Sequence, residues 1–247
     1  MENIIELEHV DAGYPGKVIL RDVTFSVRRG EVFILLGGSG CGKTTVMHHL
    51  IGLNPVLAGR LTVAGLEWSR RTRAELFRKI GVMYQSGALF GSMTCLENVM
   101  LPMEEFTRLK GKDRREKAMA LLNDVEMADA ADRLPAEISG GMRKRAAIAR
   151  AMALDPEVVF LDEPSAGLDP ITSSALDDLI LRLKNETGKT FVVVTHELPS
   201  IFKIGDRAAM FDKARSGMIA LGSPQELRDW SDDPFVRKFF NRGESHG

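Results

Sequence analysis

The residues that most clearly could do chemistry form a glycine-rich run that ends in a lysine and two threonines. They are Gly37, Gly38, Ser39, Gly40, Cys41, Gly42, Lys43, Thr44 and Thr45. The spacing G-x-x-x-x-G-K-[ST] predicts a loop whose backbone N–H groups point inward at phosphates, with the positive end of the next helix behind them. We expect Lys43 to neutralise the β- and γ-phosphates of a nucleotide and Thr44 to offer its hydroxyl to Mg²⁺. A dinucleotide fingerprint is excluded, because its third glycine, counted from Gly38, would fall on Lys43.

Two carboxylates follow a second apolar run. Residues 158–161 are Val, Val, Phe and Leu, and Asp162 and Glu163 come directly after them. Ligands bind at the carboxyl ends of parallel strands in open α/β sheets, so both acids are expected beside the phosphate loop. We expect Asp162 to hold Mg²⁺ through water and Glu163 to orient or deprotonate an attacking water. Glu163 is therefore a catalytic candidate, together with Lys43.

Other polar residues lie at the ends of predicted elements. Ser139, Gly140 and Gly141 precede a segment with helical spacing, and a serine-capped helix start presents free N–H groups to an anion. Gln85 and His196 each follow a predicted strand. His196 is therefore expected at the sheet edge that carries the two carboxylates, within reach of the phosphates, and it is a third catalytic candidate.

The elements that must position these residues are predicted from hydrophobic patterning. Continuous apolar runs rich in β-branched residues are typical of buried parallel strands, and they occupy residues 32–36, 158–161 and 191–194. Alternation with period two is typical of half-exposed strands, and it occupies residues 4–10, 23–27 and 61–63. Helical spacing dominates residues 94–153, and a further helical segment at 175–183 joins two buried strands in a βαβ unit.

The composition limits the classes of function. The chain has 247 residues, 44% of them hydrophobic and 27% charged, which excludes disorder as the main state. Thirty-three basic residues balance 34 acidic ones, so a dedicated nucleic-acid binder is not expected. Two distant cysteines indicate a reducing compartment and no zinc site. We expect no signal peptide and no apolar run long enough to span a bilayer, which leaves a peripheral membrane role.

Taken together, the ordered motifs resemble the ATP-binding cassette of ABC ATPases. The resemblance rests on the phosphate loop, Gln85, the Ser139 segment, the Asp162–Glu163 pair, Asp169 in the loop 165–169, and His196. It implies ATP and Mg²⁺ as ligands and a head-to-tail homodimer, in which each ATP lies between Lys43 of one chain and the Ser-Gly-Gly segment of the other. It also implies that Tyr14 stacks on adenine, that Gln85 touches the metal or water, that Asp169 bridges the two chains and that His196 contacts the γ-phosphate.

The same resemblance implies an α/β P-loop NTPase fold in a single domain spanning residues 1–247. A RecA-like mixed-sheet core with an antiparallel β arm is expected over residues 1–87 and 154–222. A helical subdomain is expected over residues 88–153 and a C-terminal helical tail over residues 223–247. In the tail, aromatic residues at helical spacing could pack on the chain's own core or dock on a partner.

Three segments are similar to the Mla-type subfamily of these ATPases. They are QSGALFGSMTCLENV at residues 85–99, SGGM at 139–142 and DPFVRKFFNR at 233–242. This similarity implies an ATP-hydrolysing subunit of an inner-membrane phospholipid transporter, peripheral on the cytoplasmic face. It implies an integral permease, an MCE-domain lipid-binding protein and a STAS-domain accessory subunit as partners.

Two alternatives and one departure remain. A soluble ABC ATPase, such as an iron–sulfur assembly type, shares every ATP motif. A small-molecule kinase shares the phosphate loop but has no use for the Ser139 segment.

Met142 stands where the family's signature most often has Gln, and its side chain cannot donate an amide hydrogen bond. Cys41, beside Lys43 and a helix start, is predicted to favour the thiolate.

Overall fold

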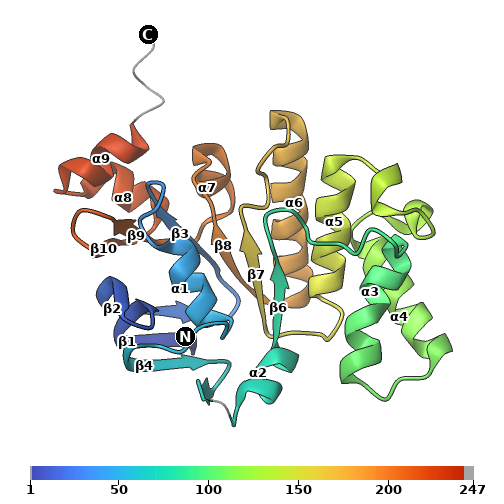
Figure 1. Cartoon of the computed structure of the whole chain (residues 1–247). Coiled ribbons are helices and arrows are strands. Elements are labelled where there is room, and N and C mark those ends of the chain that lie inside the picture. Colours follow the sequence, from blue (N-terminus) through green and yellow to red (C-terminus); the bar gives the residue numbers. More distant parts are fainter. Residues whose placement is uncertain (1, 70, 242–247) are drawn as a thin grey trace.

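The structure is a computed structural model that describes residues 2–69 and 71–241. It contains two sheets (Figure 1). The first is antiparallel, with the strand order β2-β1-β4-β5. Its strands are β1 (Asn3–Tyr14), β2 (Lys17–Arg28), β4 (Ala58–Val63) and β5 (Leu66–Glu67). This sheet is the β arm, and it includes the three segments with period-two alternation.

The second sheet carries the candidate site. Its order is β10-β9-β3-β8-β7-β6, and β9, β3, β8, β7 and β6 run parallel. The strands are β3 (Val32–Gly37), β6 (Ile80–Met83), β7 (Val158–Asp162), β8 (Thr190–Val194), β9 (Arg207–Asp212) and β10 (Gly217–Gly222). The three predicted buried strands are confirmed as parallel neighbours, so the predicted α/β fold with a mixed sheet is correct.

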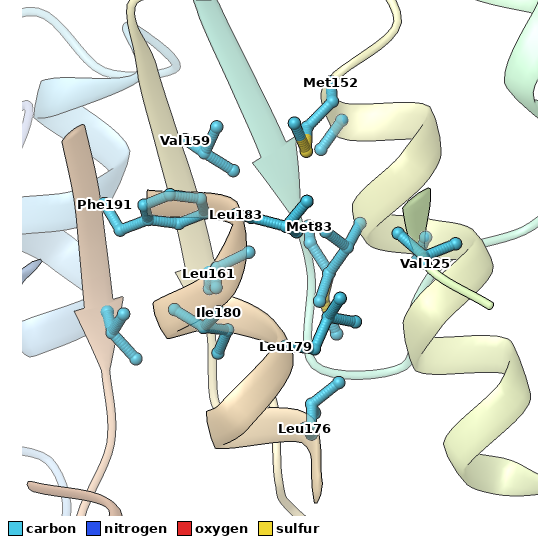
Figure 2. Close-up of a cluster of buried hydrophobic side chains, with 14 of the residues drawn as sticks. Met83, Val125, Met152, Val159, Leu161, Leu176, Leu179, Ile180, Leu183 and Phe191 are labelled. Carbon is cyan, nitrogen blue, oxygen red and sulfur yellow. The ribbon is translucent and has the colours of Figure 1, made fainter. Parts of the chain in front are cut away.

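The continuous apolar runs have a simple cause, because both faces of this sheet are covered. Along β7, Val159 and Leu161 face the helices, whereas Val158 and Phe160 face the β arm and the first helix. Figure 2 shows the helical side, where Phe191 and other side chains of the sheet meet those of the helices.

The helices lie around the two sheets. They are α1 (Lys43–Leu50), α2 (Arg73–Lys79), α3 (Cys95–Phe106), α4 (Gly111–Asp124), α5 (Gly140–Ala151), α6 (Pro170–Thr187), α7 (Leu198–Ile204), α8 (Pro224–Trp230) and α9 (Pro234–Phe240). Helices α3, α4 and α5 form the predicted helical block, and α6 connects β7 to β8 as expected. A Thr94 capping box begins α3.

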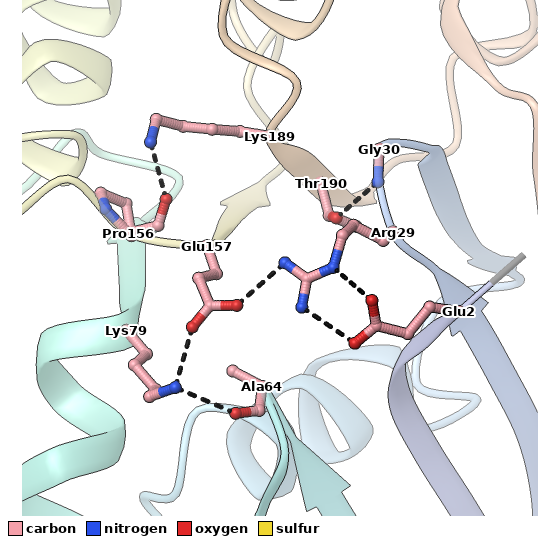
Figure 3. Close-up of polar contacts among 9 residues, drawn as sticks. All are labelled: Glu2, Arg29, Gly30, Ala64, Lys79, Pro156, Glu157, Lys189 and Thr190. Atoms are coloured by element: carbon pink, nitrogen blue, oxygen red, sulfur yellow. Dashed lines mark hydrogen bonds and ion pairs between the residues drawn. The ribbon is translucent and has the colours of Figure 1, made fainter.

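An ion-pair network fixes the end of the sheet opposite the candidate site. Glu157, just before β7, contacts Arg29 Nη1 and Lys79 Nζ, each at 2.9 Å, and Arg29 also pairs with Glu2 (Figure 3). The network joins the β arm to α2 and to the start of β7. Its position at the amino ends of the parallel strands makes it a structural contact.

The C-terminal helix packs on the chain's own core. Val236, Phe239 and Phe240 are buried, and the Phe240 ring lies 5.6 Å from that of Phe202 on α7. Of the two alternatives for the tail, packing on its own core is therefore correct for these three residues. Trp230 is 81% exposed, so it does not pack on the chain's own core. Residues 242–247 lie outside the described part of the chain.

Candidate functional site

Four parallel strands bring many of the predicted site residues to one edge of the sheet. The phosphate loop follows β3, Asp162 ends β7 and Glu163 comes directly after it. His196 follows β8, and Gln85 follows β6. They surround one pocket of ≈ 570 Å³. It is lined by Gly37, Gly38, Ser39, Gly40, Lys43, Thr44, Gln85, Asp162, Glu163 and His196. Segments more than 150 residues apart in the sequence therefore meet here.

The phosphate loop joins β3 to the start of α1, as the sequence predicts. Gly37 has φ 144°, and a Cβ there would lie 2.3 Å from the carbonyl oxygen of Phe211, so only glycine fits. Helix α1 begins at Lys43, directly after the loop. The Lys43 ammonium donates to the carbonyls of Gly37 at 2.9 Å and Gly38 at 3.1 Å. The cation thus lies inside the loop, where a phosphate charge would meet it.

The carboxylates of Asp162 and Glu163 lie in different environments. Burial raises the pKa of Asp162, and the neighbouring charge of Glu163 raises it further, whereas His48, Lys43 and Lys144 oppose both effects. Glu163 Oε1 lies 2.9 Å from His196 Nδ1. Glu163 Oε2 is buried without a hydrogen-bond partner among the residues that the structure describes. Such an orphaned acceptor in a polar pocket is suited to a bound water.

Several predicted residues do not line this pocket. Tyr14 ends β1 and is 44% exposed. Thr45 and Cys41 are buried, and Gly42 precedes α1 as its N-cap. Burial raises the pKa of the Cys41 thiol more than Lys43 lowers it, so the predicted preference for the thiolate is wrong.

The Ser-Gly-Gly segment, residues 139–141, does not line this pocket. The segment begins helix α5. In Figure 1, α5 lies apart from α1, with β6 and β7 between the two helices. Ser139 Oγ caps α5 by accepting from the N–H of Met142 at 3.3 Å, as the sequence predicts. Gly140 and Gly141 form the first turn. A Cβ on Gly141 would lie 2.6 Å from Thr172 Cγ2 on α6, so close helix packing also requires glycine there.

Asp169 is the N-cap of α6. Its carboxylate accepts from the N–H groups of Ile171 and Thr172, both at 3.0 Å. The hydroxyl of Thr172 also donates to it, and these bonds lower the pKa of Asp169. The side chain is exposed, and these bonds hold it against the first turn of α6.

Sequence reasoning missed two basic side chains of α5. The Lys144 ammonium donates to the backbone carbonyls of Gln85 and Glu163, and the Arg150 guanidinium donates to those of Gly87 and Ala88. Lys144 lies three residues after the buried Gly141 and four before the buried Ile148, on the buried face of the helix. A cation at such a position was the available signal.

The oxygen donors at the pocket fit Mg²⁺. Thr44 offers a hydroxyl, Gln85 an amide oxygen and Asp162 a carboxylate, and all three line the same pocket. Mg²⁺ prefers oxygen ligands and usually combines one or two protein groups with phosphates and waters. No cluster of three His, Cys, Asp or Glu side chains suited to a metal occurs in the described part of the chain. This donor set suits a cation that is held largely by a nucleotide.

Comparison with known proteins identifies the family. Residues 20–166 match the model of the ABC transporter family. The chain belongs to the ABC transporter family. The chain is an ATP-binding subunit of this transporter family, and the ATP-binding subunits of the family are ATPases. Among the described residues, none of the helices is long and apolar enough to cross a bilayer.

Relatives cover nearly the whole cassette. The chain is 37% identical over 240 residues to the probable ribonucleotide transport ATP-binding protein Mkl of Mycobacterium leprae, covering 96% of this chain and 68% of Mkl. It is 35% identical over 242 residues to the intermembrane phospholipid transport system ATP-binding protein MlaF of Escherichia coli K12, covering 97% of this chain and 89% of MlaF.

A solved structure supports the same fold. The cassette superposes on the ATP-binding cassette MJ0796 with a TM-score of 0.78 and 28% identity, over 89% of this chain and 98% of MJ0796. That structure is a dimer in a post-hydrolysis state, bound to ADP and Pi. The predicted α/β P-loop fold of an ABC cassette is therefore confirmed.

Proposed function

We propose that this cassette powers phospholipid transport between membranes, from the cytoplasmic face of the inner membrane. The observation that carries the proposal is its similarity to MlaF, which spans 97% of this chain and 89% of that relative. The relatives Mkl and MlaF, both named as transport ATP-binding proteins, favour this role over a soluble ABC ATPase of the iron–sulfur assembly type.

Each nucleotide site is completed by a second copy of the chain. The pocket supplies the phosphate loop, the carboxylates and His196, but Ser139, Gly140 and Gly141 lie outside it. In a head-to-tail dimer the Ser-Gly-Gly segment of one chain faces the ATP on Lys43 of the other, and Asp169 meets the facing chain. The dimer of MJ0796 supports this arrangement. Tyr14, exposed at the end of β1, stacks on adenine.

Within each site the residues divide the chemistry. Thr44, Gln85 and Asp162 would hold Mg²⁺, which would neutralise charge on the phosphates. Glu163 orients or deprotonates the attacking water with the oxygen that has no hydrogen-bond partner in the described structure. His196 holds the other carboxylate oxygen of Glu163 and faces the γ-phosphate. Lys43 neutralises the negative charge of the β- and γ-phosphates.

The chain's partners follow from the same proposal. We expect an integral permease, an MCE-domain lipid-binding protein and a STAS-domain accessory subunit. Residues 88–153 act as the helical subdomain that carries the Ser-Gly-Gly segment, within a single domain that also contains the core and the tail.

Reconstitution tests the proposal. The complex that co-purifies with the tagged chain is placed in vesicles with a fluorescent phospholipid, and ATP-dependent lipid transfer is measured. Transfer is expected for the wild type and not for Glu163→Gln. ATPase stimulation by ribonucleotides instead of phospholipid would favour the substrate named for Mkl, and co-purification without any integral membrane protein would refute coupling to transport.

A further inference from the structure

Lys144 is a buried cation that joins three functional segments. It lies on α5, the helix that begins with the Ser-Gly-Gly segment, and it is 6% exposed. Its ammonium donates to the carbonyl of Gln85 and, at 3.3 Å, to that of Glu163. The Lys144 side chain therefore connects α5 to two other segments. One is the loop after β6 that carries Gln85, called the metal-side loop below, and the other is Glu163, the residue proposed to activate water.

A buried lysine normally requires compensation for its charge. No carboxylate of the described residues lies within ion-pair distance of Lys144; burial lowers the pKa of its ammonium, and the nearby charges of Asp162 and Glu163 only partly oppose this effect. The two carbonyls thus take the place of a counter-ion. An apolar side chain of similar length would avoid the cost of burial, so packing alone does not account for a lysine here.

The Lys144 ammonium bonds to a residue whose backbone conformation is strained. Glu163 has φ 45°, a left-handed conformation that is strained for a residue with a side chain and persists only where contacts impose it. Its N–H donates to the carbonyl of Val194 on β8 at 2.8 Å, and its carbonyl accepts from Lys144. The peptide groups on both sides of the Cα are therefore held, and these bonds together with His196 fix the direction of the carboxylate.

We propose that Lys144 is a positioning residue for ATP hydrolysis. It holds the strained backbone of Glu163 and sets the distance between Glu163 and Gln85, so that the carboxylate and the metal-side loop keep one geometry. Because Lys144 is part of α5, a displacement of the Ser-Gly-Gly segment is transmitted directly to Glu163. This inference rests on the proposed role of Glu163 and is independent of the transported substrate.

The test compares Lys144→Met with Arg150→Met in the purified complex of the full chain. Methionine keeps an unbranched apolar side chain one atom shorter than lysine and removes the donors and the charge. We expect Lys144→Met to lower kcat at least about tenfold, with KM for ATP within about threefold, since positioning acts on the chemical step. Arg150 is a matched control, because it is a cation on the same helix that bonds to the same loop but not to Glu163. Its variant is expected to change kcat less than about threefold.

Two further variants keep the test decisive. Lys144→Arg retains donors for both carbonyls and is expected to recover at least half of the kcat that Lys144→Met loses. Lys144→Leu, which also lacks any hydrogen-bond donor, covers the case in which methionine prevents folding, and wild-type kcat in this variant would overturn the proposal. Equal falls in kcat, ATP affinity and melting temperature for both Met variants would also overturn it, since a merely structural role gives that result. Wild-type hydrolysis in Glu163→Gln would instead refute the proposed role of Glu163.

Discussion

The backbone N–H of Gly13 donates to Nε2 of His49 at 2.8 Å. The other ring nitrogen, Nδ1, lies 3.0 Å from the carbonyl of Asn54. The neutral ring with its proton on Nδ1 satisfies both bonds. His49 lies on α1, directly after the phosphate loop, and Gly13 precedes Tyr14, so this bond joins the adenine side of the proposed site to its phosphate side.

The stability of the cassette should therefore depend on His49 at mildly acidic pH. Burial lowers the pKa of His49 below its ordinary value of about 6.5. Below that value the unfolded chain binds a proton that the folded chain does not, so the stabilisation is complete above about pH 6.5 and is lost as pH falls from there toward the lowered folded-state pKa. We expect the melting temperature to fall between pH 7.5 and 5.5 by less in His49→Gln than in the wild type. Equal falls in both chains would show that His49 does not contribute.

Lys43→Ala and Glu163→Gln should differ in phenotype. Removing the Lys43 charge should abolish ATP binding, whereas Glu163→Gln should keep binding and lower hydrolysis by about 10²- to 10⁴-fold, because only the water-activating group is lost. Size-exclusion chromatography with ATP and Mg²⁺ should show a closed dimer for Glu163→Gln and none for Lys43→Ala. A Glu163→Gln chain that remains monomeric even with its permease would contradict the two-chain site.

Cys41 should react slowly despite its place in the phosphate loop. It is 2% exposed, and its raised pKa leaves little thiolate at neutral pH. We expect iodoacetamide to label the folded chain at least about tenfold more slowly than the urea-unfolded chain, measured by mass spectrometry. Comparing Cys41→Ser with Cys95→Ser separates the two thiols, and fast labelling of Cys41 in the folded chain would restore the prediction of a reactive thiolate.

The sequence was sufficient to predict the parts of the site that consist of local motifs. Strand β3, the glycines after it and the start of α1 are adjacent in the chain, and a run of glycines before Lys43 has few other physical uses. The strand that ends at Asp162 was equally clear, because an apolar run followed by two acids marks a strand end. The order of strands then brings these segments together through a rule common to parallel sheets.

What could not be predicted depends on contacts between distant segments. The role of Lys144 requires knowing that α5 packs beside the ends of β6 and β7, which no local pattern of α5 contains. The pKa of Cys41 required knowing that burial outweighs the charge of Lys43. The glycine at 141 looked like a phosphate contact only, although the position of Thr172 also demands it.

Asp177→Asn should stabilise the cassette at neutral pH. Asp177 is 3% exposed on α6, and burial raises its pKa, while its bond from Ser200 Oγ at 2.8 Å and the charge of Lys203 oppose the shift. The folded state holds its proton to higher pH than the unfolded state, so the ionised form costs stability above the raised pKa and not below about pH 3.8. Asparagine can still accept from Ser200. We expect a gain of about 1 kcal/mol at pH 8 that shrinks on acidification, measured by urea unfolding, and a loss at pH 8 would contradict this account.

Phe240→Ala should lower the free energy of unfolding much more than Trp230→Ala, although both residues belong to the C-terminal aromatic group. Phe240 is 3% exposed and contacts Phe202 and Phe239, so Phe240→Ala removes core packing. Truncating a buried phenylalanine usually costs about 3–5 kcal/mol, and the lower end is expected here because α9 is terminal. Trp230 is 81% exposed, so Trp230→Ala should change the free energy of unfolding by less than about 0.5 kcal/mol. Urea unfolding of the isolated chain checks both values. If Phe240→Ala left the isolated chain as stable as the wild type and weakened only the assembled transporter, α9 would be a docking element instead of part of the core.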